Sequence, residues 1–298
     1  MVALIDTRTA PEQTPPVDPR PRSANRRGPL RWVVLAIAIL TGVVMASPFL
    51  VLVLTAFRTQ SDYAAKGPFS IPDSLTLSAF ARYIRDVNFP LALWNSVAIS
   101  LLVAVIGVLI SLFASYAIGV GRIRGATLVT GVLLFATMLP QEAIIYPLFY
   151  GAQALGLRDS IWSVVIVFAV LQSAFGTYLL GSIFGTFPPS LLEAARLDGA
   201  NRWQILWRVV FPVMRPTLSV LLIFFFIWTW NEFYIPVVML TDPANQTVPI
   251  ALSTLRGQLS TDITELNAGS LLSLLPTLLF FLFFQRTLTR GITAGAVK

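Results

Sequence analysis

Residue types that commonly carry catalysis are scarce in this chain of 298 residues. It contains no histidine and no cysteine, and its only lysines are Lys66 and Lys298. The sequence therefore offers no imidazole base and no thiol nucleophile. Neither lysine follows the glycine-rich pattern of a phosphate-binding loop, so we do not expect the chain to bind ATP itself. We predict no catalytic site and no metal site, and we do not expect an enzyme.

Two acidic residues, Glu142 and Glu232, interrupt long apolar runs. An ionisable group at membrane depth is costly, which makes each a candidate functional residue. Either could bond the hydroxyls of a solute, or could be solvated or paired structurally. Together with Trp228 and Asn231 they form the candidate solute pathway, in which Trp228 could stack on a sugar ring or simply pack. Asn231 and Gln172 are expected to hydrogen-bond other helices.

The elements that hold these residues are apolar enough to cross a membrane. Hydrophobic residues make up 56% of the chain and charged residues 12%, whereas soluble domains carry about 25% charged residues. A spanning helix needs about 20 mostly apolar residues. Long, uniformly apolar runs favour helices over a barrel. The sequence predicts an all-α polytopic membrane protein with six spans, near residues 31–56, 91–118, 127–150, 160–183, 217–240 and 267–285.

The basic residues indicate how these spans are oriented. With the N-terminus inside, 15 of the 21 lysines and arginines fall on the inner side and 6 on the outer side. This bias predicts that both termini are cytoplasmic, in a plasma or inner membrane. Residues 1–28 are rich in proline and arginine, and we expect a disordered tail ahead of a transmembrane domain over 29–298. The net charge of +7 thus indicates contact with membrane lipid and no nucleic acid.

One inner loop, at about 185–216, has recognisable local signals. Ser190 and Glu193 have the spacing of a capping box, which predicts a short helix over 191–198. Gly199 can adopt a positive φ, so this helix should end there in a sharp turn.

A second helix is expected to follow that turn. Asn201 can cap its first residues, and Pro212 should end it. On these signals alone, the loop could be an ordinary helical hairpin or a short helix that another protein grips.

The residues of this loop also resemble a known pattern. Several residue types at fixed spacing closely resemble the EAA loop of ABC importer permeases of the type I fold: Glu193, Ala194, Ala195, Asp198, Gly199 and Ala200, with Pro212 downstream. The resemblance implies that the helix at 191–198 is a coupling helix, which docks on a separate ATPase. Glu193 would then either cap this helix or form a salt bridge to the partner.

Three further segments resemble, less closely, the carbohydrate branch of that family, and in particular the smaller permease subunit of its maltose-type importers. They are Asn95-Ser96, Trp230-Asn231-Glu232-Phe233 and the C-terminal residues 291–298. Glu142 departs from the pattern, because an apolar residue is expected there. The resemblance implies a sugar or polyol as cargo, with a second permease subunit, an ATP-binding subunit dimer and an extracytoplasmic solute-binding protein as partners. ATP and Mg²⁺ would be bound by the ATPase, and this chain would hold no cofactor.

Two other classes of function remain open from the residues. A proton-coupled secondary transporter could use Glu142 and Glu232, although the loop pattern and the small number of spans argue against it. A membrane-embedded enzyme is disfavoured because histidine and cysteine are absent and few carboxylates converge.

Overall fold

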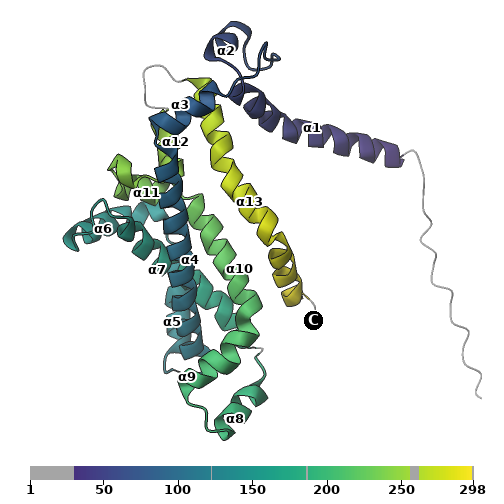
Figure 1. The fold of residues 1–298 in the computed structure, drawn as a ribbon. Coiled ribbons are helices and arrows are strands. Elements are labelled where there is room, and N and C mark those ends of the chain that lie inside the picture. Colours follow the sequence, from purple (N-terminus) through teal and green to yellow (C-terminus); the bar gives the residue numbers. More distant parts are fainter. Residues whose placement is uncertain (1–29, 122, 186, 256–261, 297–298) are drawn as a thin grey trace, which may run out of the picture. The chain divides into compact units, whose positions relative to one another are not determined.

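The computed structural model describes residues 30–121, 123–185, 187–255 and 262–296. The predicted tail at 1–28 lies outside these residues, as do the side chains of 291–298. The described part holds no β-strand, so the all-α prediction is confirmed. In chain order the helices are α1 (Leu30–Ala56), α2 (Gln60–Lys66), α3 (Ser78–Asp86), α4 (Phe89–Gly119), α5 (Ala126–Met138), α6 (Gln141–Ala154), α7 (Ile161–Phe184), α8 (Pro189–Leu197), α9 (Arg202–Ile205), the π-helical turn η1 (Leu206–Val210), α10 (Phe211–Trp230), α11 (Tyr234–Met239), the 3₁₀ turn η2 (Pro243–Asn245), α12 (Val248–Thr254) and α13 (Ile263–Ala296) (Figure 1).

Five described helices are long and apolar enough to cross a membrane, and a sixth span is counted if α5 and α6 are taken together. The span predicted near 127–150 corresponds to this pair, which is broken in the middle: α5 and α6 meet at an angle of 101°. Pro140 lacks an N–H and disfavours a helical conformation in the residue before it. Leu139 is accordingly extended, with φ −67° and ψ 127°. The predicted span at 217–240 is also displaced, because its helix ends at Trp230.

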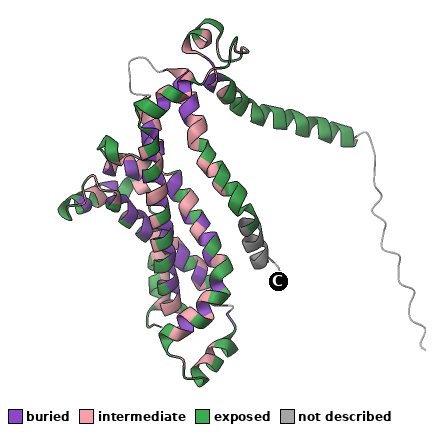
Figure 2. Cartoon of the chain, in the orientation of Figure 1, coloured by how far each residue is buried: buried purple, intermediate pink, exposed green. Residues whose placement is uncertain are grey.

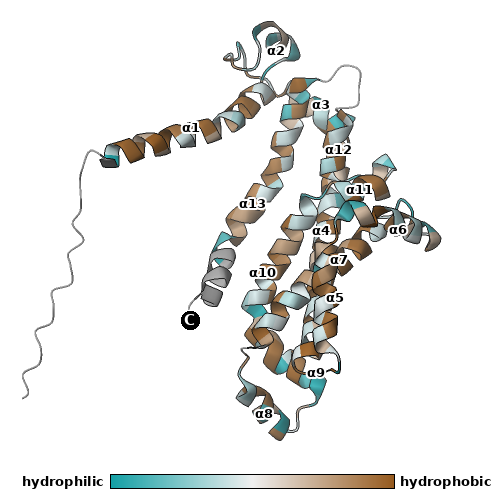
Figure 3. Ribbon diagram, turned by 180° about the vertical axis from the view of Figure 1, so that it is seen from behind, coloured by the Kyte–Doolittle hydropathy of each residue, from teal (hydrophilic) through white to brown (hydrophobic). Residues whose placement is uncertain are grey.

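The chain divides into two units, Met1–Pro48 and Phe49–Lys298. In the first unit the described residues belong to α1, and residues 31–48 are all exposed. Figure 2 shows this exposure, and Figure 3 shows that the segment is also strongly apolar. A helix that is apolar on every face requires lipid or another apolar surface around it. This part of α1 therefore has the character of a lipid-embedded segment.

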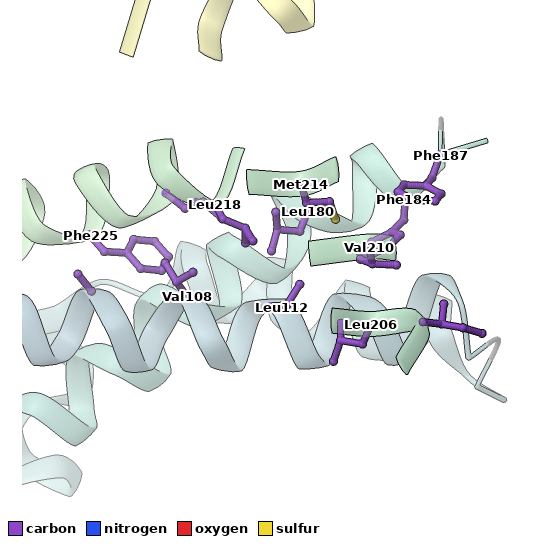
Figure 4. Close-up of a cluster of buried hydrophobic side chains, with 13 residues drawn as sticks. Val108, Leu112, Leu180, Phe184, Phe187, Leu206, Val210, Met214, Leu218 and Phe225 are labelled. Atoms are coloured by element: carbon purple, nitrogen blue, oxygen red, sulfur yellow. The ribbon is translucent and has the colours of Figure 1, made fainter. Parts of the chain in front are cut away.

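In the second unit, α4, α7 and α10 enclose the main apolar core (Figure 4). Close approach depends on small residues where the helices meet. A Cβ atom at Gly176 on α7 would overlap the hydroxyl of Ser111 on α4, and it would lie 2.9 Å from the ring of Phe225. Phe225, on α10, is fully buried between its neighbours. Glycine at 176 thus lets the three helices pack at this level.

Side-chain hydrogen bonds join α4 to the segment before α12. The Asn95 amide donates to the carbonyl oxygens of Ala244 and Gln246, at 2.9 and 3.1 Å. The Ser96 hydroxyl accepts from the Val248 amide at 2.8 Å. Both side chains are buried, so these bonds fix the segment against α4. Figure 1 shows that α3 and α12 lie at the opposite end of this unit from α8.

Asp159 makes a further link at the start of α7. Its carboxylate accepts hydrogen bonds from the Thr241 hydroxyl at 2.7 and 2.8 Å, and from the Asp242 amide at 2.9 Å. These bonds favour the ionised form and hold the pKa of Asp159 below its ordinary value of 3.8. The residue has a left-handed backbone, with φ 54°, a conformation that aspartate adopts more readily than most residues. Asp159 thus ties the α6–α7 connection to the segment after α11.

Candidate functional site

The loop over 188–201 carries α8 (Pro189–Leu197), which begins two residues earlier than the capping box predicts. Pro188 is the N-cap and makes no side-chain cap bond, and Pro189 is the first helical residue. The fixed φ of proline suits this first position. Ser190 therefore lies inside the helix, and the predicted capping box is wrong. Glu193 is exposed and makes no hydrogen bond or ion pair with any described residue, which leaves its carboxylate available to a partner.

The end of α8 is a tight, fully bonded turn. The Gly199 amide donates to the carbonyl of Arg196 at 3.1 Å, and the Ala200 amide donates to that of Ala195 at 3.0 Å. This pair of bonds defines a Schellman motif. Gly199 has φ +76°, which costs a non-glycine residue about 1–2 kcal/mol. The predicted stop at Gly199 is confirmed.

The helix after the turn begins as predicted, but it does not end at Pro212. The side chains and backbone amides of Asn201 and Gln204 bond reciprocally, at 2.9 Å each. The chain then stays helical from Arg202 to Trp230. The ring of a helical proline clashes with the carbonyl four residues earlier, and the wider π turn η1, which ends at Val210, includes that position for Pro212. We attribute the continuity of the helix to this local widening.

The two parts of the loop differ in how firmly they are held. None of the described side chains of α8 is buried, and Leu197 is 88% exposed. By contrast, Leu206 and Val210 are packed in the main core. The hydroxyl of Tyr116, on α4, donates to the Arg202 carbonyl at 2.8 Å. Therefore α8 projects from an anchored base, as Figure 1 shows.

Of the four residues predicted to line a solute pathway, Trp228 alone lines a cavity among those found in the described part. Glu142 is exposed in the first turn of α6, where a negative charge is favourable. Asn231 is exposed and bonds the Ile227 carbonyl of its own helix at 2.7 Å, so the predicted bond to another helix is wrong. One oxygen of Glu232 accepts from the Phe233 and Tyr234 amides. No cavity found in the described part of the chain is lined by more than one of these four residues.

The cavity that Trp228 lines has a volume of about 280 Å³ and lies at the break between α5 and α6. Its wall is formed by α5, α6, α7 and α10: Ala136, Thr137, Leu139, Gln141, Ile144, Phe168, Leu171, Gln172, Phe175 and Trp228. The Gln172 amide nitrogen donates to the Thr229 hydroxyl at 2.9 Å, which confirms the predicted bond between helices. Sequence reasoning missed the cavity itself. The signals for it were Gln172 within an apolar run and Pro140-Gln141 within another.

Comparison with known proteins gives this arrangement its context. The family described as binding-protein-dependent transport system inner membrane component matches residues 107–292, which is more than half of the chain and includes the whole α8 loop. The chain belongs to this family. It is thus a permease subunit of an ABC importer, embedded in the membrane by several helices, and the prediction of a transporter subunit instead of an enzyme is confirmed.

Several permeases named for sugar transport resemble this one over most of their length. The trehalose transport system permease protein SugB of Mycobacterium tuberculosis is 31% identical over 230 residues, covering 76% of this chain and 84% of that protein. The lactose transport system permease protein LacG of Rhizobium radiobacter is 30% identical over 251 residues, 84% and 90% of the two chains. The arabinooligosaccharides transport system permease protein AraQ of Halalkalibacterium halodurans is 30% identical over 275 residues, 90% and 97%.

Solved structures share the fold. A chain of a bacterial ABC transporter involved in the import of the acidic polysaccharide alginate is 25% identical and superposes with a TM-score of 0.72, covering 86% of this permease and 96% of that chain. A second alginate transporter chain, from a complex with a periplasmic protein that binds an alginate pentasaccharide, shares the fold at 17% identity and a TM-score of 0.62. The prediction of an ABC importer permease fold is thereby confirmed.

Proposed function

We propose that this permease imports a sugar or a related polyol. Trehalose, lactose and arabinooligosaccharides name the transport systems of three relatives that are 30–31% identical to it. A sugar presents hydroxyl groups and apolar ring faces, and the membrane cavity offers amides, a hydroxyl and aromatic rings. The match to several sugar permeases along most of the chain is the observation that carries this assignment.

The coupling to ATP is proposed to pass through α8. This helix is exposed, ends in the Schellman turn at Gly199, and leads through Asn201 into the helix from Arg202 to Trp230. Movement of a docked α8 would therefore reach α10 through one turn and one continuous helix. Glu193 does not take part in the cap of α8, and its carboxylate would pair with a basic group of the ATPase. Shifting a two-state gate from 1:99 to 99:1 requires about 5.5 kcal/mol of differential binding, which a stiff connection can transmit.

The partners follow from this mechanism. A second permease subunit would complete the pathway, an ATP-binding subunit dimer would bind ATP and Mg²⁺, and an extracytoplasmic solute-binding protein would deliver the sugar. The excess of basic residues on one side supports a topology with both termini and α8 in the cytoplasm. An alternative, proton-coupled transport through Glu142 and Glu232, is not favoured, because the two carboxylates share no cavity among those found in the described residues.

Reconstitution tests the energy source. The permease, its second subunit, the ATPase and the binding protein are placed in proteoliposomes, and uptake of radiolabelled trehalose, lactose and arabinooligosaccharides is measured. We expect uptake of at least one sugar with ATP and none with a proton gradient alone. Gradient-driven uptake in the absence of the ATPase would disprove the proposal.

Cross-linking tests the docking of α8, because a chain without cysteine accepts single introduced cysteines cleanly. A cysteine replacing Glu193 or Leu197 should cross-link to the ATPase from the cytoplasmic side. Ser61→Cys, on exposed α2, is the matched control and should react only with an external thiol reagent. Cross-linking of the control, or external labelling of position 197, would refute the topology.

A further inference from the structure

The cavity at the break between α5 and α6 combines three kinds of group that bind uncharged sugars. Gln141 and Gln172 supply amides, Thr137 supplies a hydroxyl, and Trp228 and Phe175 supply aromatic rings. No residue with a charged side chain is among the described residues that line it. Pockets of this kind are mainly apolar, with a few polar groups that set orientation.

Gln172 is the central polar group of this cavity. Its side chain is 6% exposed, and its amide nitrogen is already used by the Thr229 hydroxyl. Its amide oxygen is buried and has no hydrogen-bond partner among the described residues. Turning the amide around exchanges its ends but still leaves one of them unpaired. A buried polar group without a partner is costly, and Gln172 lines the cavity, so a rotation of its amide toward the cavity would let the unpaired oxygen bond a hydroxyl there.

The break in the helix supplies a second polar feature. The first amides of a helix have no partner within it, and α6 begins at Gln141, in the wall of the cavity. Broken helices in transporters place such free backbone groups where solute passes. With the Thr137 hydroxyl and the Gln141 amide beside it, the cavity is polar at the break and mainly apolar along the rest of its wall.

The aromatic side supplies a stacking surface. Trp228 is 50% exposed, and its ring meets that of Phe175 edge-on, with centroids 6.1 Å apart. The indole is thus held by its neighbour and still presents open surface. A half-exposed tryptophan beside amide groups suits the apolar face and the hydroxyls of a pyranose ring. The volume of about 280 Å³ is near the lower end of ligand pockets, about 300–1,000 Å³, which fits one ring.

We propose that this permease itself holds one neutral sugar ring during transport, with Gln172 bonding a hydroxyl and Trp228 stacking on the ring. The uncharged wall selects neutral sugars over uronates. This inference rests on the proposed sugar import, but it adds a binding site on this chain and a choice of substrate class.

A protection assay tests the site without relying on transport rates. Thr137→Cys introduces a single thiol into the cavity, and Thr127→Cys, on the exposed start of α5, is the control. In the assembled importer without its binding protein, 20 mM trehalose, lactose or arabinobiose should slow methanethiosulfonate labelling of position 137 several-fold. Labelling of position 127 should not change. Alginate oligosaccharides should give no protection.

Paired variants separate a sugar contact from a purely structural role. Gln172→Met removes the free amide and the bond to Thr229, whereas Thr229→Val removes only that bond. We expect Gln172→Met to weaken protection of position 137 about fivefold, the value of one net hydrogen bond, and Thr229→Val to leave it near normal. Trp228→Ala should weaken it about tenfold, and Phe224→Ala, exposed on α10 outside the cavity, should not.

The outcomes are distinguishable from failure of the proposed function. An importer that takes up a neutral sugar with ATP, but shows no protection at position 137, would overturn the site and keep sugar import. Equal effects of Gln172→Met and Thr229→Val, or equal protection by alginate oligosaccharides, would also overturn it. An importer that transports no sugar would instead disprove the proposed function.

Discussion

The turn at Gly199 allows a graded test of the coupling mechanism. Its φ of +76° lies in the left-handed region, where alanine costs about 1–2 kcal/mol. If α8 docks only with this turn formed, Gly199→Ala should weaken docking about 5- to 30-fold, since 1.4 kcal/mol corresponds to a factor of ten. Asparagine tolerates this region better, so Gly199→Asn should be milder. Gly199→Pro cannot reach a positive φ and also loses the amide that bonds Arg196, so it should abolish coupling.

The assay measures ATP-driven uptake and sugar-stimulated ATPase activity in proteoliposomes, with the amount of inserted permease quantified separately. The matched control is Gly125→Ala. Gly125 has φ +82°, with no atom near an added Cβ, and lies between α4 and α5. Alanine at position 125 would therefore be strained in the same way as alanine at position 199, but outside the α8 loop. Normal transport by Gly199→Pro, or equal loss in Gly125→Ala, would refute the reasoning.

Three further predictions concern the framework. Gly176→Ala should lower stability by about 1–3 kcal/mol through overpacking against Ser111, seen as a lower melting temperature, whereas Gly181→Ala, with open space around it, should not. Asn201→Ala should lower stability by about 1 kcal/mol through loss of the helix cap and should reduce uptake. Because the pKa of Asp159 is depressed, its stabilising bonds are fully present above pH 3.8 and are lost as pH falls through the lower, folded-state pKa. The protection factors of the amides within residues 241–245, which correct for the intrinsic pH dependence of hydrogen exchange, should therefore fall on acidification in the wild type, and Asp159→Ala should show low protection at every pH. An unchanged melting temperature, unchanged uptake or pH-independent protection in the wild type would contradict the respective prediction.

Hydropathy was sufficient to locate most of the membrane segments, because a long apolar run is visible in the local sequence alone. It could not reveal the break after α5. Residues 127–150 are apolar on both sides of Pro140, and a proline within a span can produce either a mild kink or a full break. Neighbouring helices decide between these outcomes, and their positions are not visible in a single run of sequence.

In the α8 loop, too, the features set by the nearest backbone were predictable, and those set by other parts of the structure were not. Gly199 and Asn201 act through the nearest backbone, and both were predictable. Ser190 did not cap, because two prolines before it set the helix start earlier. Pro212 did not end its helix, because the wider π turn before it accommodates the proline ring. The cavity was also beyond local signals, since Gln172 and Trp228 are more than 50 residues apart in the sequence.

The continuous helix from Arg202 to Trp230 has a geometric consequence. Trp228 stands 26 residues above Arg202, about 39 Å along the helix at 1.5 Å per residue. A tilt of about 5° at the foot would move the indole sideways by about 3.4 Å, roughly the thickness of an aromatic ring. Small angular errors at the base are magnified in the same way. The base thus has to be held more rigidly than the cavity it serves, and the Tyr116 bond and the buried Leu206 and Val210 provide that rigidity.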